Sequence, residues 1–155
     1  MTEARMPTLH ELVTSLSSPD ITVRVTAIGE SVRQPDAYRP VLATILADAQ
    51  LAVRPRVWAM IAVCQSQHVA EPALLRGLLA CLADAEPIVR RSAIETLEVL
   101  RVEEAVPEIA AHLSDHAPIP DAWFDDQSTP SQAAKRALES IGSAEALRLL
   151  TSKHS

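Results

Sequence analysis

The chain contains 155 residues, of which 48% are hydrophobic and 22% are charged, and its formal net charge is −6. Three glycines and 3% aromatic residues are too few for the turns and strands of a β-sandwich or barrel, so the composition predicts an all-helical protein. The widely separated glycines exclude a glycine-rich phosphate-binding loop, and the acidic balance argues against nucleic acid as a partner.

Apolar periodicity and helix-start signals predict an all-α chain of about nine helices without strands. The first helix spans 8–17 and begins with the capping box Thr8-x-x-Glu11. Pro55 lies inside a helix expected from about residue 50 and should kink that helix. The other helices are expected in four pairs, at 20–33 and 37–47, 50–66 and 71–83, 86–101 and 103–114, and 129–142 and 144–152. The helix at 71–83 should bury one stripe of leucines, namely Leu75, Leu78, Leu79 and Leu82.

An internal repeat runs through most of the chain. Segments 46–64 and 82–100 align without a gap at an offset of 36 residues, and further copies align at 16–30 and 125–142. Because one amphipathic helix pair is too small to bury its own apolar stripe, the pairs should stack into a continuous core. The repeats predict a single domain over 1–155, with copies at about 18–47, 48–83, 84–115 and 125–152 and an inserted loop at 116–130.

The copy at 82–115 has a Leu-Asp turn, then Val-Arg, an Ala/Leu-spaced helix, and Val106-Pro107 early in its second helix. This pattern resembles the HEAT-like repeat of the phycobilin-lyase type over nearly the whole chain. The resemblance implies a right-handed α-solenoid of four helix pairs with an N-terminal capping helix. The sequence departs from the pattern at Ser18, which replaces the turn aspartate, and at Pro130-Ser131, which replaces Val-Arg. Such arrays serve many unrelated tasks, so the resemblance predicts the fold more sharply than the function.

An acidic and a basic residue recur six positions apart, as Asp48 with Arg54 and as Asp84 with Arg90. Catalytic groups rarely recur periodically, so a structural role is favoured. Each aspartate should accept N–H bonds from the start of the next helix, and each arginine should pair with a neighbouring aspartate. The two pairs are predicted to form a structural ladder between repeats.

Metal binding and catalysis find little support in the sequence. The pair His10-Glu11 is similar to the His-Glu motifs of HEAT-repeat deoxyhypusine hydroxylases, whose di-iron sites need several such pairs. We therefore expect neither an enzyme nor a bound metal or cofactor. One further group of potential ligands is not expected to bind a metal, because its members are also explained as turn and loop residues: His112, Asp115, His116 and Asp121.

Cys64 and Cys81 should lie roughly 10 Å apart along a helical hairpin, too far for a disulfide. Free thiols fit a reducing cytoplasm. The opening segment lacks the apolar core of a signal peptide, and the longest apolar run, 57–64, is too short to span a membrane. A cytoplasmic protein of bacterial type, without a membrane partner, is expected.

The resemblance implies that the second helix of each pair lines a concave groove. Val41, Ile45, Gly77 and Cys81 would form its small and apolar floor, although small residues are also expected from an alanine-rich composition. The role of the loop at 116–130 stays open, because it either anchors a partner or folds back over the helices. The partner-binding residues predicted on this basis are Val41, Thr44, Ile45, Gly77, Cys81, Glu104, Glu108, His112 and Trp123.

These features predict a non-catalytic scaffold or adaptor that binds a helix or peptide of another protein. The acidic side chains of Glu104 and Glu108 favour a partner with a basic segment. The alternative is an accessory factor in cofactor attachment or enzyme maturation, similar to phycobilin lyase subunits.

Overall fold

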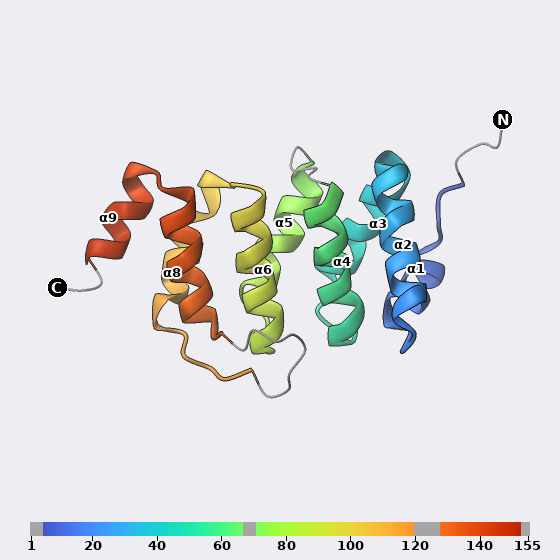
Figure 1. Ribbon diagram of the computed structural model, residues 1–155, viewed down its shortest axis with the longest axis horizontal. Coiled ribbons are helices and arrows are strands. Elements are labelled where there is room, and N and C mark those ends of the chain that lie inside the picture. The colour runs from blue at the N-terminus through green and yellow to red at the C-terminus, as the bar shows by residue number, and fades with distance from the viewer. Residues whose placement is uncertain (1–4, 67–70, 120–127, 153–155) are drawn as a thin grey trace. The chain divides into compact units, whose positions relative to one another are not determined.

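The computed structural model describes residues 5–66, 71–119 and 128–152, and all regular secondary structure in these ranges is helical (Figure 1). The all-α prediction is therefore confirmed for the described residues. The chain divides into two compact units, Met1–Cys81 and Leu82–Ser155, and the division lies next to residue 83, the predicted end of a repeat.

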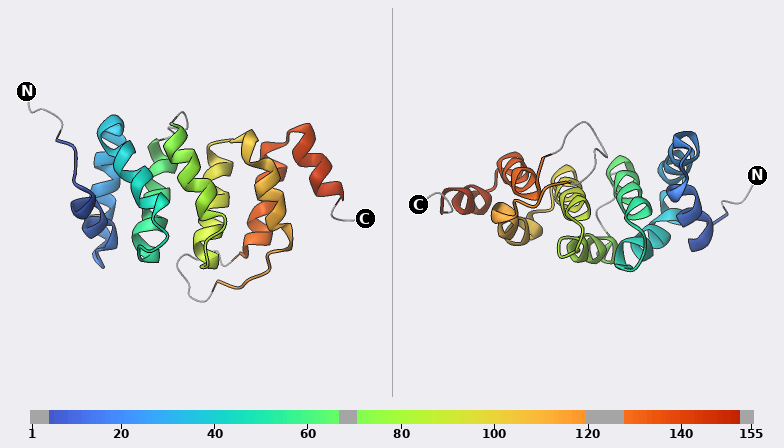
Figure 2. Two further views of the ribbon diagram at one scale, coloured as in Figure 1. Left: turned by 180° about the vertical axis from the view of Figure 1, so that it is seen from behind. Right: turned by 90° about the horizontal axis from the view of Figure 1, so that it is seen from below.

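The first unit contains two helix pairs and one additional helix. Helix α2 packs against α4 and α3 packs against α5, so one pair stacks on the other, while α1 contacts α2, α3 and α4 (Figure 2). Their fully buried side chains include Leu16, Ile45, Leu46, Met60 and Leu78. The helices are α1 (Leu9–Ser17), α2 (Ile21–Arg33), α3 (Pro35–Ala47), α4 (Val53–Ser66) and α5 (Pro72–Cys81).

The second unit is built around α8, which packs against α6, α7 and α9. Its expected helix at 103–114 is broken into short 3-10 and α segments. Pro107 has no N–H to donate to the Glu103 carbonyl and would clash with it, so the α-helix restarts at Val106 with Pro107 in its first turn. The elements are α6 (Pro87–Val99), η1 (Glu103–Ala105), α7 (Val106–Ala110), η2 (Ala111–Ser114), α8 (Pro130–Ile141) and α9 (Ala144–Ser152).

Helix starts follow the expected chemistry, with one correction. The Thr8–Glu11 capping box is present, and Thr129 begins α8 in the same way. Helix α4 begins at Val53 rather than near residue 50. Pro55 therefore occupies the first turn, where backbone N–H groups have no intrahelical acceptor and a proline costs no hydrogen bond. The predicted kink is not expected at this position.

Each described turn residue of the repeats makes the same local hydrogen bond. Its side-chain oxygen accepts a hydrogen bond from the backbone N–H two residues later, so the serine of the first copy replaces the aspartate without loss of this bond. The N···O distances are 3.1, 2.9, 2.9 and 3.4 Å for Ser18, Asp48, Asp84 and Asp115, respectively.

Arg90 pairs with an aspartate, whereas the ladder between repeats stays a prediction. Its guanidinium donates to both carboxylate oxygens of Asp115, at 2.7 and 3.1 Å, and to the Asp84 carbonyl at 2.8 Å. At the same place in the first copy, Arg24 donates to a backbone carbonyl and lies over the Trp58 ring, 4.6 Å from its centroid. The corresponding role of Arg54 remains a prediction.

Helix α6 ends at Val99, and Arg101 lies just beyond its C-cap, Leu100. The φ of Arg101 is 52°, the only positive φ of a non-glycine residue in the described ranges. The Val102 N–H donates to the Leu97 carbonyl at 3.1 Å, and the Arg101 N–H donates to the Glu98 carbonyl at 3.0 Å. These two bonds define a Schellman motif, in which the left-handed position occupied here by Arg101 is usually a glycine. The arginine adds a bond of its own, from Nη1 to the Ser140 carbonyl at 2.9 Å.

Replacing Arg101 tests this ending. Both Arg101→Ala and Arg101→Gly remove the bond to Ser140, but only glycine relieves the left-handed backbone. The glycine variant should therefore be more stable than the alanine variant by about 1 kcal/mol, measured by urea unfolding. Equal stabilities would show that the positive φ carries no cost here.

Candidate functional site

The predicted groove floor is not on the surface. Val41, Ile45 and Cys81 are only 8%, 0% and 2% exposed, and Gly77 is buried as well. A partner cannot reach side chains that are packed inside the first unit. The prediction that these four residues bind a partner is wrong, and they belong to the core instead.

Close packing of α5 against α3 explains their burial. A Cβ atom at Gly77 would lie only 2.9 Å from the Leu46 Cβ, so glycine is needed for the two helices to approach. The Cys81 thiol, next along the same face, donates to the Leu46 carbonyl at 3.4 Å. The close backbone contact that a glycine in mid-helix suggests is therefore made by α3.

The buried face of α5 also differs from the predicted leucine stripe. It consists of Leu74, Gly77, Leu78 and Cys81, whereas Leu75 and Leu79 are half-exposed. Neighbouring leucines fit more than one stripe at helical spacing, and a glycine contributes no hydrophobic signal to choose between them.

The remaining predicted residues are spread over both units. Thr44 is exposed in the first unit, and Glu104 and Glu108 are exposed in the second. The half-buried His112 ring contacts backbone carbonyls of its own unit, with Nε2 2.6 Å from the Leu82 oxygen and Nδ1 2.9 Å from that of Glu108. Trp123 lies outside the described residues.

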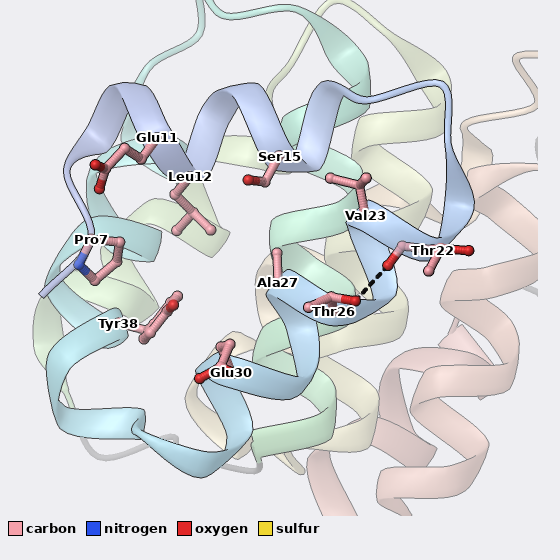
Figure 3. Close-up of a pocket in the computed structure, with 10 residues that line it drawn as sticks. All are labelled: Pro7, Glu11, Leu12, Ser15, Thr22, Val23, Thr26, Ala27, Glu30 and Tyr38. Atoms are coloured by element: carbon pink, nitrogen blue, oxygen red, sulfur yellow. Dashed lines mark hydrogen bonds between the residues drawn. The ribbon is translucent and has the colours of Figure 1, made fainter. Parts of the chain in front are cut away.

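A pocket of about 370 Å³ lies between α1, α2 and the start of α3 in the first unit (Figure 3). Leu12 projects into it from α1, opposite Ala27 of α2, and Tyr38 lies between Pro7 and Glu30 at one end. This volume falls at the lower end of the range of ligand pockets, about 300–1,000 Å³. Its lining residues are Pro7, Glu11, Leu12, Ser15, Thr22, Val23, Thr26, Ala27, Glu30 and Tyr38.

The lining is acidic, because it contains two carboxylates and neither lysine nor arginine. Glu11 accepts from the Thr8 backbone N–H at 3.0 Å, and mainly this bond holds its pKa below the ordinary value. Arg5 pairs with the same carboxylate at 2.7 Å. Burial raises the pKa of the Tyr38 phenol, and the nearby Glu30 charge adds to the shift, so the phenol stays neutral at physiological pH.

Exposed apolar side chains are concentrated in residues 6–32 of the first unit. Of the eight large hydrophobic residues exposed in the described ranges, six lie between residues 6 and 32. Ile21, Val25 and Val32 share one face of α2. We define the α1–α2 surface as Met6, Leu9, Ile21, Val23, Val25 and Val32, which are 40–57% exposed.

This surface is not predicted by the repeat, because aligned positions of the copies are expected to share one environment. Val23 aligns with Val89, which is fully buried, yet Val23 itself is 40% exposed. Among the described residues α2 is contacted by α1, α3 and α4, and these helices leave Val23 exposed.

A second pocket, of about 470 Å³, lies in the second unit. Acidic and basic groups alternate around it, and they contact one another: Arg136 lies 3.8 Å from Glu95, and Arg101 bonds to Ser140. The arrangement therefore shows no net preference for an anion or a cation.

Three further features bear on function. Within residues 5–66, 71–119 and 128–152, no group of three or more His, Cys, Asp or Glu side chains is placed to hold a metal ion. No helix among the described residues combines the length and the apolar character needed to cross a membrane. No disulfide joins the two cysteines, as predicted.

The chain matches no protein-family model and no curated protein.

Proposed function

We propose that the protein is a non-catalytic, cytoplasmic scaffold of HEAT-like repeats that binds a helix or extended segment of another protein. The stacking of α2 on α4 and of α3 on α5, with the shared turn bonds of the copies, supports a solenoid arrangement of the repeats. Two cysteines that form no disulfide agree with a reducing compartment.

The α1–α2 surface is the observation that carries the proposal. Here Ile21, Val25 and Val32 occupy exposed positions on one face of α2, and this face points away from the pocket-lining positions of the same helix. Grouped exposed apolar side chains mark protein interaction sites more often than isolated ones do.

Selection from a random peptide library displayed on phage tests this function. The wild-type protein should enrich peptides that the double variant Ile21→Asp/Val25→Asp binds at least about tenfold more weakly, because two charges would enter the apolar contact. Leu147→Asp, at an exposed apolar position on α9, is the matched control and should bind like the wild type.

Circular dichroism should show that both variants fold, because the substituted positions are exposed. Enriched peptides that bind the double variant as tightly as the wild type would contradict the proposed site. Failure of the wild-type protein to enrich any peptide would contradict binding of such segments.

A further inference from the structure

Resting on the proposed function, we propose that the pocket between α1, α2 and α3 receives a lysine or arginine side chain of the bound segment. The proposal names the chemistry of the partner: a long side chain with an apolar stem and a cationic end.

The charge of the lining selects a cation. Glu11 and Glu30 are its charged residues, and Ser15, Thr22 and Thr26 add hydroxyl groups that can accept hydrogen bonds. An anionic side chain would meet two carboxylates, whereas an ammonium or guanidinium group could form charge-assisted hydrogen bonds with them.

Glu30 has the capacity to accept such a bond. It already pairs with Arg33 and accepts from Gln34 Nε2 at 3.1 Å. The Arg33 side chain is 66% exposed, so this surface ion pair contributes little stability and can be shared or exchanged at small cost. Glu11 is less available, because it is held by its capping box and by Arg5.

The apolar part of the pocket suits the stem of the side chain. Leu12, Val23 and Ala27 provide aliphatic walls, against which the methylene groups of lysine or arginine can be buried while the charged end stays near acceptors. Tyr38 adds a neutral aromatic ring beside Glu30, and aromatic rings attract cations placed over their faces (Figure 3).

Titration of the full chain followed by amide NMR tests this inference with three probes: the Nα-acetyl methylamides of lysine, arginine and norleucine. Norleucine keeps the aliphatic stem and lacks the charge. At least one cationic probe should shift the amides of Leu12, Ser15 and Ala27 and bind at least about fivefold more tightly than norleucine, which is the effect of one charge-assisted bond.

Substitution locates the binding site. Glu30→Gln should lower the affinity for the cationic probe about fivefold. Glu139→Gln, at an exposed position on α8, is the control and should leave this affinity unchanged. Equal binding of the cationic probes and norleucine, absence of binding by all three, or an unchanged affinity in Glu30→Gln would overturn the inference.

The two proposals can fail separately. Peptides that depend on Ile21 and Val25 but contain no basic residue would refute the cationic pocket and leave the protein-binding function standing. Specific binding of the lysine probe without any peptide recognition would refute the protein-binding function and leave the pocket chemistry standing.

Discussion

Gly77→Ala should lower the free energy of unfolding, whereas Gly29→Ala should raise it. Alanine is the better helix former at both positions by about 1 kcal/mol. At Gly29 a new Cβ meets nothing within 4 Å, so this gain is realised in full. At Gly77 the new Cβ would lie 2.9 Å from the Leu46 Cβ, which is fixed to the α3 backbone and cannot rotate away.

Gly77→Leu should have the larger effect, a loss of about 3 kcal/mol or more, because a whole side chain would be forced between α3 and α5. Urea unfolding followed by circular dichroism measures all three variants. A Gly77→Ala variant as stable as Gly29→Ala would show that the two helices separate without cost. Reduced partner binding by Gly77→Leu is expected as a consequence of unfolding, since position 77 lies inside the core.

Asp115→Asn should also destabilise the protein strongly, by about 1.5–3 kcal/mol at pH 7. The Asp115 and Arg90 side chains are only 17% and 16% exposed, and the substitution leaves the arginine facing a neutral group. The matched control is Asp36→Asn. The Asp36 side chain is 93% exposed, and its carboxylate lies 3.3 Å from the Arg39 guanidinium. That change should cost less than about 0.5 kcal/mol, because exposed ion pairs are screened by water.

The effect of Asp115 should depend on pH. Hydrogen bonds from Arg90 hold the pKa of the Asp115 carboxyl below its ordinary value, so the unfolded chain binds a proton at this site more readily than the folded chain does. The stability it contributes is present above the unfolded pKa, about 3.9, and is lost as the pH falls through the folded pKa.

The stability difference between the wild type and Asp115→Asn should therefore be constant near neutral pH and shrink below about pH 5. Urea unfolding of both proteins across this range measures the difference. A gap that stayed constant down to the lowest pH at which both proteins fold would contradict a charge-dependent role for Asp115.

The sequence by itself determined the helices and the turns between them. Capping boxes, prolines at helix starts and apolar spacing act within one or two turns of the chain, so their effect is visible in adjacent residues. The bond from Arg90 to Asp115 was also predictable, because the copies of the repeat place both residues in equivalent turns and helices. The internal repeat therefore carried some tertiary information.

Tertiary structure decided which faces are covered. Whether Gly77 and Cys81 lie in a groove or in the core depends on how closely α5 approaches α3, and a glycine leaves no hydrophobic signal of that approach. In the same way, the alignment gives Val23 and Val89 one equivalent position, but their burial differs because only the latter is covered by neighbouring helices. Local sequence sets helix propensity and period, whereas exposure depends on the neighbours that each helix finds when the chain folds.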